Sequence, residues 1–231
     1  MLQGLKALRH ANIEAADGPV GTLDRVLIDI DHWAIRHLVV DAGGWWDQHE
    51  VLVSPQAVRG GGPGDRALRL SLTRAQVKSG PGAMLRAPLL PPAVPAGIAG
   101  IDDARQASSA GAAVLEDARG DLGLVDSLDI LGTHVHATDG DIGHVEDFLV
   151  DVDTWSLRYL VVDTSNWWIG KQVLISPDWI DRFDWPGGKL HVGLDRASVK
   201  GAPEYDGTTP PGRATEAALF RHHRRPPYWV E

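Results

Sequence analysis

The sequence predicts a mostly β protein that contains two small β-barrels in tandem, joined by a linker rich in proline, alanine and glycine. Three observations carry this prediction. The chain of 231 residues repeats itself at one fixed offset, since Asp17 recurs as Asp139, 122 residues later. Within each copy, short runs of alternating apolar and polar residues are separated by turn signals. Neither copy contains a long stretch with helical periodicity.

The repeat holds without a gap over about seventy residues, which indicates two copies of one domain. The matched segments are Asp17-Gly18 with Asp139-Gly140, Leu38-Val39-Val40-Asp41 with Leu160-Val161-Val162-Asp163, Trp45-Trp46 with Trp167-Trp168, and Ser54-Pro55 with Ser176-Pro177. Four segments follow: a first copy over residues 5–83, a linker over 84–126, a second copy over 127–204 and a C-terminal tail over 205–231.

Each copy reads as a series of short strands. In the second copy the strands are expected at 133–138, 145–151, 156–163, 172–175 and 189–194. Asp139-Gly140 is a hairpin turn signal, and the Ser176-Pro177 step ends a strand. Asp195 is expected to cap a short helix over 196–200, as Thr73 does in the first copy. Five or six such strands favour a small closed or nearly closed barrel, because closure removes exposed strand edges.

The linker and the tail differ in composition from the two copies. Four prolines between residues 85 and 100 predict a semi-extended linker without regular sheet. In the tail, residues 214–220 are compatible with a helix, and the chain ends in a basic and aromatic segment. This basic tail either lies on the acidic second copy or forms a solvated, disordered end, and the second alternative is favoured.

Composition narrows the function classes. The chain has no cysteine, which excludes disulfides, thiolate metal sites and cysteine nucleophiles and fits the cytoplasm. The net charge is −9, and the second copy carries thirteen acidic and six basic residues, so a nucleic-acid partner is not expected. No secretory signal and no run of about 20 apolar residues is present, so direct membrane insertion is not expected either.

The segment from Ala137 to Phe148, followed by Trp155 to Asp163, resembles the PRC-barrel domain. The first copy is similar over residues 17–21 and 33–41. The family is named for the cytoplasmic domain of the photosynthetic reaction centre H subunit and also includes a domain of a ribosome-maturation factor. The resemblance implies a docking and scaffold module, with association to a photosynthetic or other membrane complex through a partner, at the periphery of the inner membrane. The chain lacks the membrane helix that precedes the domain in the H subunit.

The tryptophan pairs are the candidate interaction residues: Trp45, Trp46, Trp167 and Trp168. Adjacent residues of a strand point to opposite faces, so one ring of each pair can enter the barrel while the other faces outward. Burial of both rings is equally compatible with the sequence. The outward rings, with Val51 and Val173, are the expected contact through which the two barrels pair, within the chain or in a homodimer. Trp33 and Trp155 follow turns and are expected to cover barrel ends.

Two groups of residues have the composition of metal sites. Asp29 and Asp31 recur as Asp151 and Asp153, but no further oxygen ligands follow at the spacing of a calcium loop, so a solvated turn is the preferred interpretation. The second copy also carries a set of three histidines and one aspartate on a predicted hairpin, namely His134, His136, Asp139 and His144. Such a set could hold zinc, but exposed polar side chains on strands explain it more simply.

No nucleophile elbow, phosphate loop or dinucleotide fingerprint is present in the sequence. The predicted function is therefore a non-enzymatic interaction protein without a cofactor or a specific metal. A metal-dependent binder or enzyme that uses the histidine set is the first alternative. A ribosome- or RNA-associated factor is the second alternative, and the acidic second copy argues against it.

Overall fold

The structure, a computed structural model, describes residues 1–43, 49–61, 67–81, 124–165, 171–184 and 188–230. The first half contains a short strand and helix, β1 (Leu2–Gly4) and α1 (Leu5–Leu8), followed by β2 (Asn12–Ala15), β3 (Gly18–Asp29), β4 (Ala34–Asp41), β5 (Glu50–Val53), the 3₁₀ turn η1 (Pro55–Ala57), β6 (Val58–Gly60), β7 (Ala67–Leu70) and α2 (Arg74–Lys78).

The second half repeats this order, starting with β8 (Leu124–Asp126) and α4 (Ser127–Ile130). The remaining elements are β9 (His134–Ala137), β10 (Gly140–Asp151), β11 (Ser156–Asp163), β12 (Gln172–Ile175), η2 (Pro177–Trp179), β13 (Ile180–Asp184), β14 (Lys189–Val192), α5 (Arg196–Gly201) and the longer α6 (Arg213–His222). The mostly β class predicted from the sequence is confirmed.

The fourteen strands of the described residues belong to one mixed sheet, and the two halves of that sheet have the same strand order. In the first half β6, β7, β2, β3, β4 and β5 are neighbours in that order, and in the second half β13, β14, β9, β10, β11 and β12 are. The expected closure of each barrel is not found in the part of the chain that the structure describes, since no ladder there joins β5 to β6 or β12 to β13. The turns η1 and η2, each beginning with a proline, separate these strands.

Most of the expected strand positions are confirmed in the second half. The strands over 156–163 and 172–175 have the predicted bounds. The strand expected from residue 145 begins at Gly140, directly after the hairpin turn, where Gly140 has a φ of 143°. Strand β13 was not predicted, and residues 124–126, assigned to the linker, form strand β8 instead. Residues 84–123 of the predicted linker lie outside the described residues.

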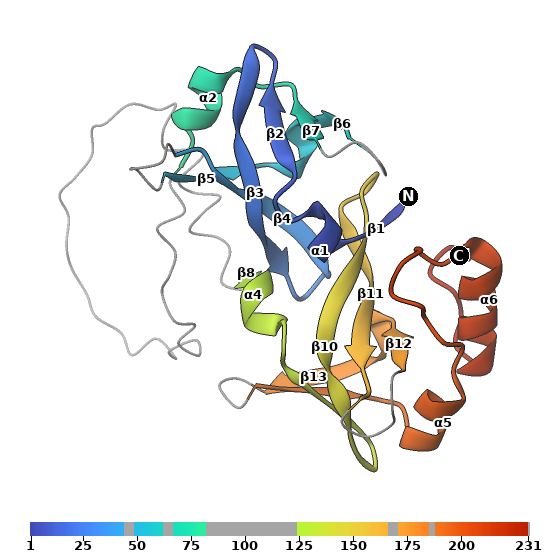
Figure 1. Ribbon diagram of the computed structural model, residues 1–231. Coiled ribbons are helices and arrows are strands. Elements are labelled where there is room, and N and C mark those ends of the chain that lie inside the picture. Colours follow the sequence, from blue (N-terminus) through green and yellow to red (C-terminus); the bar gives the residue numbers. More distant parts are fainter. Residues whose placement is uncertain (44–48, 62–66, 82–123, 166–170, 185–187, 231) are drawn as a thin grey trace, which may run out of the picture.

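The two halves exchange their first strands (Figure 1). Strand β1 precedes the first half but pairs antiparallel with β10 of the second half, and β8 pairs in the same register with β3 of the first half. Between these two ladders, the β3–β4 turn of the first half meets the β10–β11 turn of the second half. There the amide of Ile35 donates to the carbonyl of Trp155, and the amide of Leu157 donates to the carbonyl of Trp33. The contact between the halves thus includes two equivalent strand ladders and the backbone hydrogen bonds of the crossing turns.

The turn tryptophans lie at this crossing rather than at barrel ends. Trp33 and Trp155 have left-handed backbone conformations, with φ of 49° and 56°. Trp155 is buried in a hydrophobic core that contains residues of both halves. A non-glycine residue in this conformation is uncommon, and here it directs both carbonyls across to the other half.

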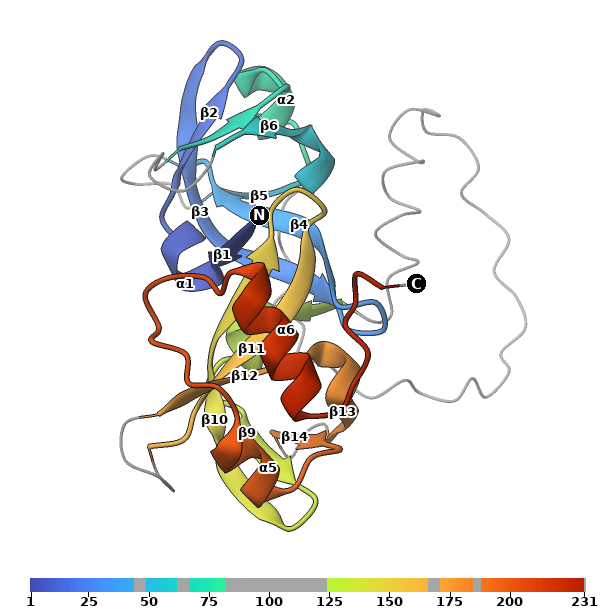
Figure 2. The ribbon, with the colours of Figure 1, turned by 90° about the vertical axis from the view of Figure 1, so that its right-hand side faces the viewer.

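The C-terminal tail is ordered against the second half. Helix α6 includes the helix expected at 214–220, but the favoured prediction of a solvated, disordered end is wrong for residues 213–230. We call residues 205–230 the C-terminal arm. Figure 2 shows α6 across the face of β11 and β12. Phe220 is buried there, with its ring 5.3 Å from that of Trp179 and 6.3 Å from that of Tyr159. Among the described residues, none of the helices has the length and apolar character required to cross a membrane.

Candidate interaction site

The tryptophan pairs Trp45-Trp46 and Trp167-Trp168 lie outside the described residues. Their expected neighbours Val51 and Val173 are fully buried in the core, on β5 and β12. Neither valine is available as an outward contact. The described junction of the halves lies instead at β1, β8 and the crossing turns.

The predicted histidine set is divided among different contacts. His134 on β9 lies directly opposite His144 on β10 in the ladder. His136 contacts Asp141 through Nδ1 at 2.7 Å and packs its ring edge-on against His191. The carboxylate of Asp139 accepts a hydrogen bond of 2.8 Å from the amide of Arg196 at the start of α5. Asp139 therefore has a structural role at the beginning of a helix.

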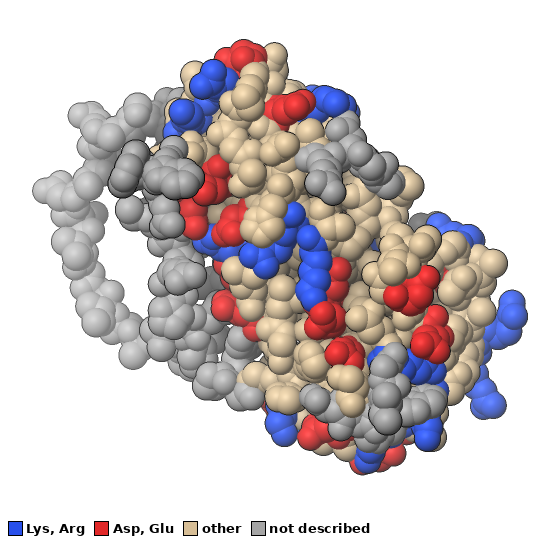
Figure 3. All heavy atoms as spheres, viewed as in Figure 1, with Lys and Arg blue, Asp and Glu red and all other residues tan. Residues whose placement is uncertain are grey.

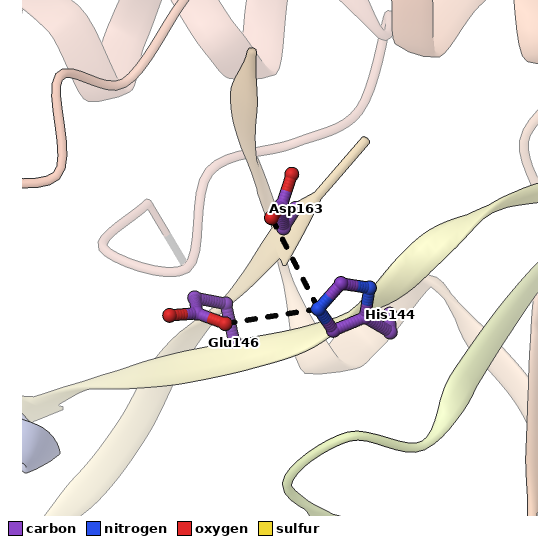
Figure 4. Close-up of side chains that lie close together, drawn as sticks. All are labelled: His144, Glu146 and Asp163. Atoms are coloured by element: carbon purple, nitrogen blue, oxygen red, sulfur yellow. Dashed lines mark ion pairs between the residues drawn. The ribbon is translucent and has the colours of Figure 1, made fainter. Parts of the chain in front are cut away.

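Only His144 of the predicted set takes part in a group of convergent ligand atoms in the described chain (Figure 4). His144 Nε2 lies 3.7 Å from Glu146 Oε2 and 4.0 Å from Asp163 Oδ2. The predicted set did not include Glu146, which lies two residues from His144 on β10, or Asp163, which the ladder brings opposite His144 from β11. A divalent cation would have to compete with Lys6, which already pairs with Glu146. The absence of specific zinc or calcium binding stays a prediction, testable by calorimetry with a His144→Ala control.

The Asp-x-Asp segments form turns, as predicted, but neither first aspartate is fully solvated, since Asp151 is half-buried and pairs with the amino group of Met1. Asp29 is buried, and its Oδ2 accepts a hydrogen bond of 2.6 Å from Arg36. Burial alone would raise the pKa of Asp29, but hydrogen bonds from Arg36 and His32 outweigh it and hold the pKa below its ordinary value. Its oxygens also accept the amides of Asp31 and His32. These contacts leave the carboxylate engaged in holding the turn.

A cleft of about 1140 Å³ lies between the start of the chain, strand β10 and the C-terminal arm. Its walls are residues 1–4 and 6–11, the arm residues Tyr205 and 207–211, and Arg213, Glu216 and Tyr228 of the arm. In the space-filling view, basic and acidic side chains alternate over α1 and β10 at this place (Figure 3). This cleft could not be predicted from the sequence, because its two walls are more than 190 residues apart in the chain.

The arm side of the cleft is held by a buried glutamate. Glu216 is 3% exposed, and its Oε1 accepts hydrogen bonds from the hydroxyls of Tyr159 at 2.9 Å and Tyr228 at 2.8 Å. Burial, together with the negative charge of Glu216, raises the pKa of Tyr159. Arg213 pairs with Glu216 at 3.2 Å and lies over the ring of Trp229 at 4.1 Å. This network fixes the arm beside the cleft.

In the first half, a buried arginine occupies the outer face of the long strand β3. Arg25 is 5% exposed, and its guanidinium contacts Asp126 at 2.6 Å, Glu50 at 2.7 Å and Asp24 at 2.6 Å. Hydrogen bonds to Glu50 are the largest cause that raises the pKa of Arg25. Asp126 belongs to the exchanged strand β8, so this ion-pair network joins the two halves.

In the second half, Asp147 stands at the position that corresponds to Arg25. Asp147 is half-buried, lines the cleft and accepts a hydrogen bond of 2.9 Å from the amide of Lys6. Burial raises the pKa of this carboxyl group, although the Lys6 amide opposes the shift. The structure thus places a partly desolvated carboxylate on the floor of a cleft, which is an arrangement suited to binding a cation.

Comparison with known families gives one match. Residues 126–192, which span β8 to β14, match the PRC-barrel domain. This region contains the strands that carry Asp147, His144 and Tyr159. The match covers one of the two sets of repeated strands. Among curated proteins, none matches the chain.

Proposed function

We propose that this protein is a non-enzymatic scaffold that binds a protein partner in the cleft between its first residues and the C-terminal arm. The observation that carries the proposal is the cleft itself, which is about 1140 Å³ in volume and has the half-buried Asp147 on its floor. Its other described acidic groups, Asp151 and Glu216, are engaged in contacts that hold the chain start and the arm. This pattern favours binding over proton-transfer chemistry.

We also infer that residues 5–83 are a second PRC-type unit. The support is the repeated strand order, in which β2 to β7 correspond to β9 to β14, and the reciprocal exchange of β1 and β8. In this proposal the two units form one intramolecular pseudo-dimer. A tandem unit of this kind presents one continuous surface to a partner.

The resemblance of the sequence to the PRC-barrel domain, the family named for the cytoplasmic domain of the reaction centre H subunit, is the support for a narrower proposal about the partner. We place the protein in the cytoplasm, at a photosynthetic reaction-centre-like or other membrane complex, held there through the partner. The net charge of −9 disfavours RNA or ribosome association.

The test is capture of partners from the native host by the full tagged chain, followed by quantitative mass spectrometry. Two variants add the same bulk at exposed positions: Ala7→Trp on the cleft wall and Ala214→Trp on α6 outside the cleft. A specific partner should be captured by the unmodified chain and by Ala214→Trp, and lost with Ala7→Trp. Equal capture by all three proteins would show that the cleft is not the binding site, and capture of RNA-associated complexes would favour the ribosomal alternative.

A further inference from the structure

We propose that the cleft receives an arginine side chain of the protein partner and that Asp147 binds its guanidinium group. This inference rests on the proposed function, because it names the chemistry of the partner segment. Three observations carry it: the contrast between the two halves, the close approach of the acid to a glycine of the exchanged strand, and the engagement of the other charged groups of the cleft.

In the first half, the position that corresponds to Asp147 is Arg25, and its charge is paired with carboxylates of the same chain. There Arg25 reaches Asp126 of the exchanged strand at 2.6 Å and Glu50 at 2.7 Å. In the second half the strand carries the acid, Asp147, and Gly4 of the exchanged strand stands where Asp126 stands in the first half. The second half therefore has the carboxylate of an arginine–carboxylate pair but not the arginine. The charge on β10 is negative where the charge on β3 is positive.

Gly4 lets the acid lie close to the exchanged strand. A Cβ atom at Gly4 would lie 2.8 Å from Asp147 Oδ2, so any other residue there would crowd this oxygen. Oδ1 accepts the Lys6 amide at 2.9 Å, whereas Oδ2 accepts no hydrogen bond from a described side chain. A planar guanidinium that enters the cleft can approach this oxygen with a favourable N–H···O geometry.

The basic side chains of the cleft wall are already engaged. Lys6 pairs with Glu146, and Arg213 pairs with Glu216 at 3.2 Å. Arg9 donates to the carbonyl of Asp24 at 2.8 Å. Among the described residues, no basic side chain lies within ion-pair distance of Asp147. An arginine from outside the chain would therefore relieve the cost of keeping this carboxylate partly desolvated.

Two neutral groups of the same cleft extend the site. Gln3 is about nine-tenths buried, and its Nε2 has no hydrogen-bond partner among the residues that the structure describes. This amide can donate to a backbone carbonyl of the entering segment, because an unsatisfied buried donor is costly. Tyr205 also lines the cleft, and its ring gives the aliphatic part of an arginine side chain an apolar surface.

The test is a titration of the full chain with N-acetyl-L-argininamide, followed by two-dimensional amide NMR. The neutral citrulline analogue, which has nearly the same shape, is the probe control. We expect the arginine probe to shift the amide signals of Gly4, Lys6 and Asp147 and the citrulline probe to bind at least tenfold more weakly. In Asp147→Asn, which keeps an oxygen to accept the Lys6 amide, the arginine probe should also bind at least tenfold more weakly.

A second variant provides a control in which an arginine of the chain itself occupies the site. The double substitution Gly4→Asp with Asp147→Arg copies the Arg25–Asp126 pair of the first half and should not bind the arginine probe. Equal binding of the two probes, or unchanged binding in Asp147→Asn, would overturn the inference. A partner that is lost with Ala7→Trp but bound equally by Asp147→Asn would overturn the arginine site and leave the proposed function intact.

Discussion

Phe220 is the most deeply buried aromatic residue of the C-terminal arm, and its removal is expected to release the arm. The side chain is 1% exposed, and its ring lies 5.3 Å from that of Trp179 and 5.4 Å from that of Trp229. Replacing a buried phenylalanine with alanine costs about 3–5 kcal/mol, because both transfer free energy and packing are lost. The arm is joined to the sheet through one chain connection, so this loss should weaken the docking of the arm before it unfolds the sheet.

The measurement is hydrogen–deuterium exchange with mass spectrometry on arm peptides over 205–230 and on β11. A loss of about 3 kcal/mol corresponds to a fall in protection of about 100-fold. Phe220→Ala should show this fall in the arm, with little change in strands β2 and β3. Thr215→Ala, an exposed position on the same helix, is the control. A change of less than tenfold in the arm, or an equal loss of protection in the first half, would refute the reasoning.

Three further outcomes are expected. First, burial and the nearby charges of His222 and Arg225 lower the pKa of His223 from 6.5 to about 4. Docking of the arm should therefore be strongest above pH 6.5 and weaken as the pH falls toward 4, because the undocked histidine binds a proton more readily. The variant His223→Gln should show a smaller pH dependence of docking, measured by tryptophan fluorescence. Second, a Cβ at Gly143 would lie 1.9 Å from the Asp163 carbonyl oxygen, so Gly143→Ala should lower the free energy of unfolding by about 3 kcal/mol or more. The control Gly132→Ala, which has open space around the added Cβ, should lower it by about 1–2 kcal/mol. Urea unfolding of both variants measures these free energies. Third, cutting the chain within residues 84–122 should leave two fragments that elute together in size-exclusion chromatography with light scattering, because β1 and β8 are exchanged; separate elution in native buffer would contradict the exchange.

The features that could be predicted from the sequence are those set by neighbouring residues. Short apolar runs bounded by turn residues located β11 and β12. Thr73 and Asp195 were predicted as helix caps, and both side chains accept the amide three residues later. The Asp-Gly turns were predicted because glycine adopts the positive φ that these turns require.

The candidate site was not predictable in the same way. The histidine set was chosen because its members are close in sequence, but the ladder register placed His144 beside Asp163 of another strand. The sequence alone gives no reason to single out Asp147. Its position becomes significant when it is compared with Arg25 and when Gly4 is seen beside it.

The sequence by itself determined the repeat, most strands and turns of the second copy, and the helix of the tail, because these depend on local residue pattern and backbone preference. Only the tertiary structure decided where β1, β8 and the arm lie. A strand of three residues contains too little pattern to specify its partner, and β1 pairs with residues almost 150 positions away. Burial of Leu219 and Phe220, together with the Glu216 hydrogen bonds, orders a tail that its polar and basic composition suggested would be solvated. The cleft exists only because these long-range contacts bring the two ends of the chain to the same strand.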